Sequence, residues 1–329
     1  MEEAIEPRPQ VPGRTLLLVV LGGMTAFLLI APAFLNLYWM RVLSSVFMFG
    51  ALAQALNIIA GYTGYPAFGN VVFFGLGGYT TAVLMVRFGV PFWVGVLAAA
   101  TLCAAVAGLV GPALLRLRGH YFAIGTLGLN EATRAVVDNL TETTGGGQGI
   151  SLPLPEGSAL ANTIAFYFLF FGVMVLATVV TALWTRGRYG LASRAIRADE
   201  EAAGSMGVNA TRVKTLAWTV SALLTGIVGA IYAYRIAWIE PSAVFDMNMA
   251  VKIFVILLIG GAGTVLGPLL GALFIEIVAT FTWSSFLEYH TLVLGVIIIA
   301  VALWLPGGIA AFIPEQLARA RLALGMGRR

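Results

Sequence analysis

Residues 193–214, SRAIRADEEAAGSMGVNATRVK, form the most polar stretch of an otherwise apolar chain and carry seven charged side chains. Asp199 is well placed to cap a helix, because Glu200 and Glu201 would then occupy the first turn, where the helix dipole favours acids. Gly204 and Gly207 supply a stop signal. The pattern predicts a helix of about seven residues, and so short a helix must dock against something to be stable.

The composition around this segment is that of a membrane protein. Of 329 residues, 60% are hydrophobic and only 10% are charged, whereas soluble domains carry about 25% charged residues. Counting apolar runs against the ~20 residues that a membrane-crossing helix needs, we expect an all-α polytopic protein with about ten spans, including glycine-broken segments. The predicted spans are 15–35, 39–60, 66–88, 91–115, 121–139, 160–185, 212–239, 247–262, 266–287 and 291–311.

The basic residues predict the orientation of these spans. With ten spans, the clusters near Arg14, Arg116, Arg194 and Arg329 all fall on one side, which must be the cytoplasm. The loop at 140–159 has neither Lys nor Arg and falls outside. We therefore expect a cytoplasmic tail at 1–14, a membrane domain at 15–311 with a basic cytoplasmic segment at 186–214, and a basic cytoplasmic tail at 312–329. The first apolar run is interpreted as a span and not as a cleaved leader.

Several function classes find no support in the sequence. No G-x-x-x-x-G-K-[ST] motif is present to bind nucleotide phosphates. Cys103, His120 and His290 are isolated from one another, so a metal site is not expected. We find no pair of nucleophile and base, and the basic residues lie at segment ends and not in a patch for nucleic acid. The sequence therefore does not predict an enzyme.

Glycine clusters at 61–64, 75–78 and 260–263 mark places where membrane helices break or approach closely. Helix packing alone is an equally good explanation for 75–78. The other two clusters, one in each half, favour broken helices around a translocation path. They also hint at an internal repeat whose orientation the sequence leaves open.

Charged side chains inside spans face the protein interior or water, because lipid solvates them poorly. Glu131, Arg134 and Asp138 share one stripe, so Glu131 forms either a local ion pair or part of a solute path. Glu276 has no partner nearby in sequence and is the better candidate to contact a solute. Lys252 and Arg235 lie near outer helix ends, from where they can reach the membrane interface.

The motifs together carry a family resemblance. Glu201-Ala202-Ala203, followed by Gly207, resembles the E-A-A-x-x-x-G signature of ABC importer permeases. The stretches 117–127, 61–79 and 260–276 resemble the branched-chain amino-acid permeases of the high-affinity Leu/Ile/Val type, as do Glu131, Arg134, Asn139 and 144–150. The resemblance covers residues 40 to 310, and the order of the motifs is similar to that in the longer of the two permeases of such transporters.

The resemblance implies a role for the polar segment and a set of partners. The segment would be a coupling helix that binds a cytoplasmic ATPase, so ATP would be bound by partner subunits and the chain itself would hold no cofactor or metal. A second related permease, two ATP-binding subunits and an extracytoplasmic solute-binding protein would complete a transporter in the bacterial inner membrane, in contact with lipid and with no nucleic acid. The implied coupling residues are Arg197, Asp199, Glu200, Glu201, Ala202, Ala203, Gly204 and Gly207.

The implied translocation path runs past the glycine breaks and the residues near them. Its candidate residues are Gly61, Gly64, Phe68, Asn70, Thr126, Glu131, Gly263 and Glu276. The chain reads Tyr65-Pro66-Ala67-Phe68-Gly69-Asn70 where relatives read closer to L-S-L-G-H, so urea, short amides and other amino acids remain alternative solutes. An ion-coupled carrier that uses Glu131 and Glu276 as a proton relay is a separate alternative, as is a membrane-embedded enzyme or structural subunit.

Overall fold

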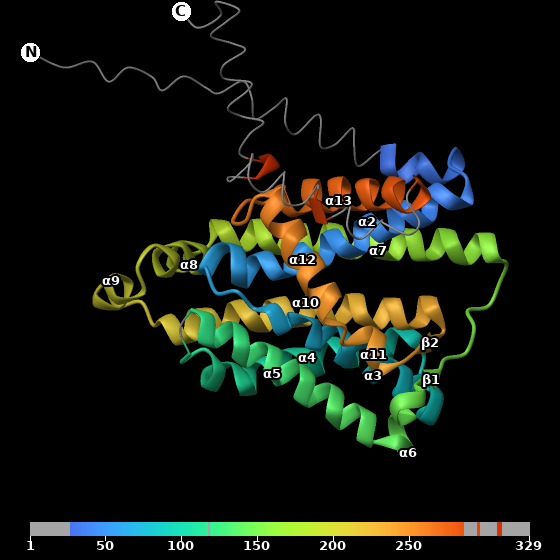
Figure 1. Ribbon diagram of the computed structural model, residues 1–329, viewed down its shortest axis with the longest axis horizontal. Coiled ribbons are helices and arrows are strands. Elements are labelled where there is room, and N and C mark those ends of the chain that lie inside the picture. The colour runs from blue at the N-terminus through green and yellow to red at the C-terminus, as the bar shows by residue number, and fades with distance from the viewer. Residues whose placement is uncertain (1–26, 118, 286–294, 297–307, 311–329) are drawn as a thin grey trace, which may run out of the picture.

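The computed structural model describes residues 27–117, 119–285, 295–296 and 308–310 (Figure 1). Within these residues, six helical segments are long and apolar enough to cross a membrane: Leu37–Gly61, Phe68–Phe88, Phe92–Leu114, Ala159–Arg186, Ala210–Ile236 and Pro241–Gly260. They coincide with six of the ten predicted spans. The prediction of a polytopic helical protein is thus confirmed, but the count of ten is not.

The other four predicted spans have different outcomes. The span at 121–139 is a helix, α5 (His120–Asn139), but its charged residues make it too polar to count among the six. The span at 266–287 is α13 (Gly267–Ser285), of which Gly267–Thr282 is a shorter apolar helix. The spans at 15–35 and 291–311 lie largely outside the described residues, as do the predicted tails at 1–14 and 312–329.

The remaining elements connect the long helices. The bounds along the chain are η1 Ala31–Ala33, α2 Leu37–Leu56, η2 Asn57–Gly61, η3 Phe68–Asn70, α3 Val71–Phe88, α4 Phe92–Leu114, α5, α6 Thr141–Thr144, η4 Gly146–Gln148, β1 Ile150–Ser151, α7 Ala159–Arg186, α8 Arg188–Ala198, α9 Glu200–Ser205, α10 Ala210–Ile236, β2 Trp238–Ile239, α11 Pro241–Val244, α12 Met247–Gly260 and α13. Polar side chains begin several of these helices: Asn36, Ser158 and Asn209 each accept a hydrogen bond from a backbone N–H of the first turn.

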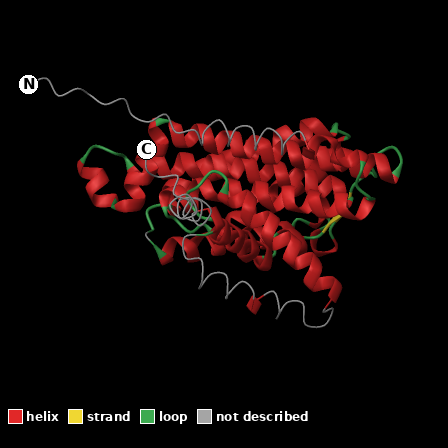
Figure 2. Ribbon diagram, turned by 90° about the horizontal axis from the view of Figure 1, so that it is seen from above, coloured by secondary structure: helices red, strands yellow, loops and turns green. Residues whose placement is uncertain are grey.

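The helices pack in two layers. In the view of Figure 1, α2, α7 and α13 form the upper layer and α3, α4, α5 and α10 the lower one. Seen from above, in Figure 2, the long helices run side by side. α10 packs along α3 and α4 and also contacts α2 and α7, so it joins the layers. α8 and α9 lie at one end of the bundle, and β1, β2 and α6 lie at the other.

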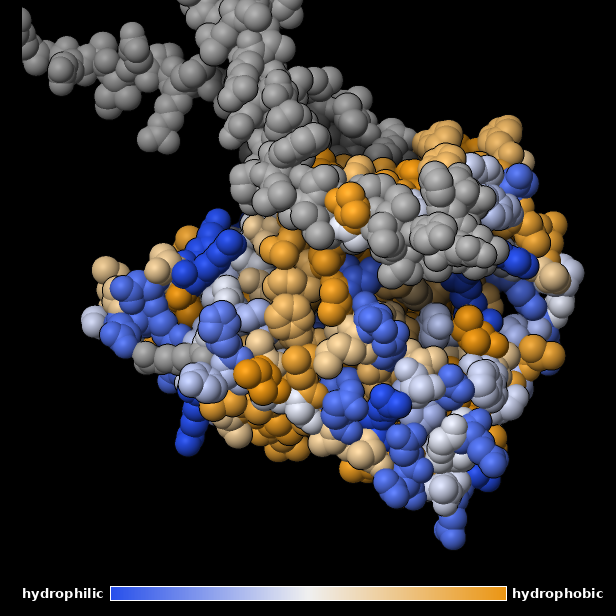
Figure 3. Space-filling view, viewed as in Figure 1, coloured by the Kyte–Doolittle hydropathy of each residue, from blue (hydrophilic) through white to orange (hydrophobic). Residues whose placement is uncertain are grey.

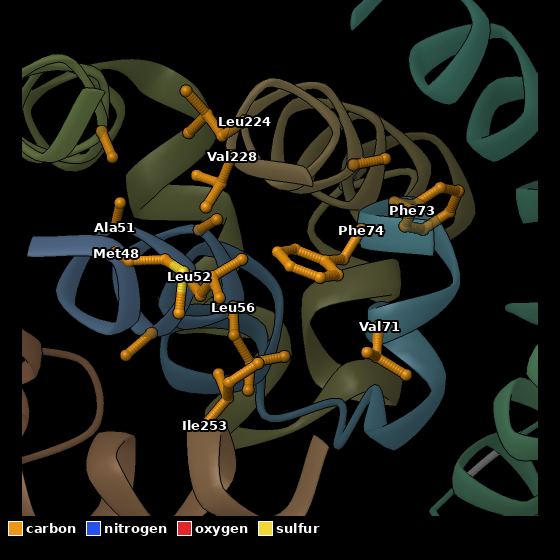
Figure 4. Packing of buried hydrophobic residues seen from close by; sticks show 14 of the residues in the cluster. Met48, Ala51, Leu52, Leu56, Val71, Phe73, Phe74, Leu224, Val228 and Ile253 are labelled. Atoms are coloured by element: carbon orange, nitrogen blue, oxygen red, sulfur yellow. The ribbon is translucent and has the colours of Figure 1, made fainter. Parts of the chain in front are cut away.

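An apolar core fills the space between the layers. Leu52 and Leu56 of α2 lie near Leu224 and Val228 of α10 and Ile253 of α12 (Figure 4). Orange, apolar side chains also cover much of the outer surface (Figure 3). A helix that is apolar on both its inner and outer faces suits a lipid surrounding, which agrees with the membrane prediction.

The segment at 140–159, expected as an external loop, contains short elements of its own. β1 pairs antiparallel with β2, with Ile150 opposite Ile239. Gly149 has φ +77, and a Cβ there would lie 2.2 Å from the carbonyl oxygen of Ile239. A glycine is therefore required where the loop meets β2. Within the described residues, this two-stranded ribbon is the one departure from an all-α fold.

Candidate functional site

The polar segment folds as predicted around Asp199. Its Oδ1 accepts hydrogen bonds from the backbone N–H groups of Glu201, at 2.9 Å, and Ala202, at 3.0 Å. The helix α9 has six residues, close to the predicted seven, and Gly207 follows it with φ +86. The sequence analysis missed α8, which precedes α9 and begins directly after Gly187.

Arg197, the C-terminal basic residue of α8, joins this segment to both predicted glycine breaks. Its Nη1 donates a hydrogen bond to the carbonyl oxygen of Gly61. A Cβ on Gly263 would lie 2.5 Å from the same Nη1, and a Cβ on Gly64 would lie 3.1 Å from Cγ of Arg197. Gly61, Gly64 and Gly263 therefore lie around Arg197. The sequence predicted these three glycines for the translocation path and Arg197 for coupling.

Two amides of α2 and η2 hold the second glycine break against the first. Asn57 donates from Nδ2 to the carbonyl oxygen of Thr264 and accepts from the backbone N–H of Gly263, both at 2.8 Å. Gln54 donates from Nε2 to the carbonyl oxygen of Val265 at 2.9 Å. Sequence reasoning missed both amides, although a polar side chain within the apolar run at 39–60 was the available signal.

A buried ammonium ties the same segment to α10. Lys214 is only 1% exposed, and its Nζ lies 2.7 Å from Oε1 of Glu200, 2.8 Å from the hydroxyl of Tyr65 and 3.2 Å from the carbonyl oxygen of Leu115. The Tyr65 hydroxyl in turn donates to Oε2 of Glu200. α9, the turn after Gly64 and the start of α10 are thus bound into one polar cluster.

Two cavities lie along one face of α2, further towards the ribbon end. The larger, of about 300 Å³, is lined by Met48, Phe49, Tyr232, Ala243, Asp246, Asn248, Met249 and Lys252. The smaller, of about 10 Å³, is lined by Leu52, Leu56, Ala67, Phe68, Asn70, Val71, Thr225, Ala250 and Ile253. The smaller cavity has room for about one water molecule, so the space between the helices closes there.

The predicted path residues near η3 surround this constriction. Phe68 and Asn70 line it, and Asn70 donates from Nδ2 to the hydroxyls of Ser221 and Thr225, at 3.2 and 3.1 Å. Thr126 is fully buried beside it and accepts a hydrogen bond from the backbone N–H of Gly69 at 3.1 Å. The structure therefore brings Phe68, Asn70 and Thr126 together.

Glu131 and Glu276 lie apart from that group. Oε2 of Glu131, whose side chain is 53% exposed, is 3.8 Å from Nη1 of Arg134, which also lies 3.9 Å from Asp138 through Nε. Of the two readings of this stripe, the structure shows the local ion pair. Glu131 lines neither of the two cavities.

Glu276 has a partner that the sequence did not reveal. Its Oε1 lies 2.5 Å from Nζ of Lys252, which also lies 4.0 Å from the ring centroid of Phe49. The sequence analysis expected Lys252 at the membrane interface and did not foresee this ion pair. Within the described residues, no three His, Cys, Asp or Glu side chains gather closely enough to hold a metal ion.

Residues 38–302 match the model of one protein family, the permease components of branched-chain amino acid transport systems. The chain belongs to this family. It is 32% identical to the high-affinity branched-chain amino acid transport system permease protein LivM of Escherichia coli (strain K12), over 81% of this chain and 68% of LivM. The high-affinity branched-chain amino acid transport system permease protein LivH of the same organism is 30% identical over 42% of this chain and 44% of LivH.

The similarity extends to permeases named for other solutes. The fructose import permease protein FrcC of Rhizobium meliloti is 35% identical over 32% of this chain and 32% of FrcC. No solved structure matches the chain. Family membership and the apolar helices together identify a membrane-spanning transport permease, and the greater coverage of LivM agrees with the predicted resemblance to that permease.

Proposed function

We propose that this chain is a permease subunit of an ABC importer for branched-chain amino acids, in which α9 binds a cytoplasmic ATPase and the solute passes along α2. The observation that carries the proposal is the contact of Arg197 with Gly61 and Gly263. Through this contact, the segment that would bind the ATPase also contacts both glycine breaks of the membrane helices. A displacement of α8 and α9 therefore acts directly on those breaks.

The cavities support the position of the path. The larger cavity lies between α2, α10 and α12, and the constriction at Phe68 and Asn70 follows one or two turns further along the same helices. Beyond the constriction lie Asn57 and the two glycine breaks, where Arg197 contacts Gly61 and Gly263. From Met48 towards the C-terminal end of α2, the larger cavity comes first, then the constriction, and then the glycine break at Gly61, against which the coupling segment lies.

The surface of α9 supports a docked partner. Ala203 is buried against the bundle, whereas Glu201, Ala202 and Ser205 are exposed, and Met206 is 86% exposed. The helix α9 thus packs against the bundle on one side and is exposed on the other, so its exposed side can insert into a groove of a partner protein. ATP would be bound by the partner, because the chain has no phosphate-binding motif.

The distribution of charge supports the orientation. The coupling segment carries Arg186, Arg188, Arg194, Arg197 and Lys214, and the loop at 140–159 carries no Lys or Arg; these lie at opposite ends of the bundle in Figure 1. By the positive-inside rule, the α9 end faces the cytoplasm. We further propose a bacterial inner membrane location with both termini cytoplasmic, a second permease related to LivH, two ATP-binding subunits and an extracytoplasmic solute-binding protein.

Transport by the reconstituted complex tests the proposal. The chain, its companion permease and the two ATPase subunits are placed in liposomes with the binding protein outside and ATP inside, and uptake of labelled leucine is measured with leucine, urea, acetamide or fructose as unlabelled competitor. We expect uptake that requires ATP and is blocked only by branched-chain amino acids. Uptake without ATPase subunits that follows a proton gradient would instead support the ion-coupled carrier.

A further inference from the structure

A third cavity lies at the end of the bundle opposite α9. It has a volume of about 380 Å³ and opens between the ends of α2, α7 and α10, beside the segment that joins β1 to α7. Figure 1 shows that segment running along the outer edge of the molecule, and Figure 3 shows the surface hollowed near the right-hand end of the same view. The cavity is lined by Arg41, Ser44, Leu154, Pro155, Asn162, Thr163, Phe166, Arg235 and Ile236.

The polar lining of this cavity is cationic. Arg41 and Arg235 contribute two guanidinium groups, and none of the lining residues is acidic. Within the described part of the chain, neither guanidinium forms an ion pair, and Arg235 instead lies 5.6 Å from the ring centroid of Phe170. Two like charges that line one cavity repel each other. An anion placed between them would remove that repulsion.

The other polar groups of the lining are already engaged. The hydroxyl of Ser44 donates to the carbonyl oxygen of Met40 at 2.7 Å, and Thr163 donates likewise to its own helix at 2.8 Å. Asn162 donates to the carbonyl oxygen of Pro155 at 3.1 Å. The guanidinium groups are the charged donors of the lining, and their planar geometry suits the two oxygens of a carboxylate.

The cavity is in line with the candidate path. Arg41, Ser44, Met48, Leu52 and Leu56 recur at intervals of three and four residues, so they form one stripe along α2. On α10, Ile236, Tyr232 and Thr225 recur at four and seven residues and also share one face. The three cavities therefore succeed one another along the same faces of the same two helices.

We propose that the cavity between Arg41 and Arg235 binds the carboxylate of the amino acid at the external entrance of the path. The apolar part of the lining, Leu154, Phe166 and Ile236, is suited to an aliphatic side chain. The inference rests on the proposed function for the direction of entry. Beyond the proposed function, the inference identifies the carboxylate as the part of the solute that binds first, and Arg41 and Arg235 as the residues that bind it.

Binding of three related probes to the complex without its binding protein tests this inference. The probes are leucine, 4-methylpentanoate, which lacks the ammonium group, and 3-methylbutylamine, which lacks the carboxylate. They are titrated at up to millimolar concentration into the permease–ATPase complex in lipid nanodiscs. We expect leucine and 4-methylpentanoate to bind and the amine not to bind. Equal binding of the amine, or no binding of either carboxylate, would overturn the proposal.

Substitutions locate the binding. Arg41→Gln and Arg235→Gln should each weaken 4-methylpentanoate binding at least about tenfold, because each removes one charge-assisted contact. Arg87→Gln is the matched control: Arg87 ends α3 on the same side, lines none of the three cavities and donates to the carbonyl oxygen of Glu142. Unchanged binding in Arg41→Gln/Arg235→Gln contradicts the site. ATP-driven leucine uptake by the unmodified complex, measured separately, shows whether the proposed function stands when the site does not.

Discussion

Arg197 donates a hydrogen bond to the carbonyl oxygen of Gly61, although the two residues lie 136 positions apart in the chain. The bond connects a helix outside the membrane bundle to the π-helical end of a spanning segment. Such a bond to a charged donor is worth about 1.5–3 kcal/mol. It therefore links the segment that we propose to bind the ATPase to the first glycine break.

Loss of this bond should uncouple transport from ATP hydrolysis. For Arg197→Gln we expect leucine uptake to fall about tenfold or more, in line with about 1.5–3 kcal/mol of lost coupling, while the ATPase rate of the complex persists. Uptake and phosphate release are measured on the same proteoliposomes. Arg194→Gln is the control, because Arg194 carries the same charge on the same helix but donates its hydrogen bond to the carbonyl oxygen of Thr185 and not to a glycine break. Equal loss in both variants would mean that the general positive charge matters and the bond does not.

Gly263 should resist any side chain. Its φ is +84, and a Cβ would lie 2.5 Å from Nη1 of Arg197. For Gly263→Ala we expect a loss of at least about 1–2 kcal/mol from the left-handed backbone alone, seen as a lower thermal unfolding midpoint, together with reduced uptake. Gly172→Ala within α7 meets no atom within 4 Å and should be neutral or slightly stabilising. A stable, active Gly263→Ala variant would show that Arg197 does not occupy the position described.

Glu200 and Lys214 should contribute unequally to stability. Glu200→Gln removes the carboxylate charge that lies 2.7 Å from the 1% exposed ammonium of Lys214, which costs about 3 kcal/mol or more. Lys214→Met leaves a carboxylate that is 23% exposed and still bound by Tyr65, so the loss should be smaller. Unfolding midpoints of both single variants and the double variant give the coupling. The reverse order of the two single variants contradicts the importance of burial here.

Part of this arrangement could be read from the sequence and part could not. The helix at 199–207 was predictable because its capping signals at Asp199 and Gly207 are local, and the long spans were predictable because each is a continuous apolar run. The partners of Arg197, Lys214 and Glu276 were not predictable, since they lie on helices that only the packing brings together. Glu276 is an example: the sequence shows no partner and so makes it a candidate to bind the solute or a backbone donor, whereas the packing brings Lys252 next to it.

A charge exchange separates a structural role of Glu276 from a role in solute binding. Glu276→Lys and Lys252→Glu should each reduce uptake strongly, because two like charges then face each other in a partly buried site. The combined exchange restores an opposite pair. We expect it to recover a substantial part of the wild-type uptake, measured at equal membrane levels. If the exchanged pair is stable by thermal unfolding and yet inactive, Glu276 contacts the solute directly.

The central claim is that the ATPase binds to α9. Two variants test it, with the same Glu→Arg substitution made either in α9 or at the opposite end of the bundle. Glu201→Arg reverses a charge on the exposed side of α9, and Glu156→Arg makes the same change in the exposed segment after β1 at the other end of the bundle. Co-purification of the ATPase subunits and ATP-driven leucine uptake are measured for both variants. We predict that Glu201→Arg loses both while Glu156→Arg retains the ATPase subunits. Full ATPase binding and full uptake in Glu201→Arg would contradict the assignment of α9 as the coupling helix.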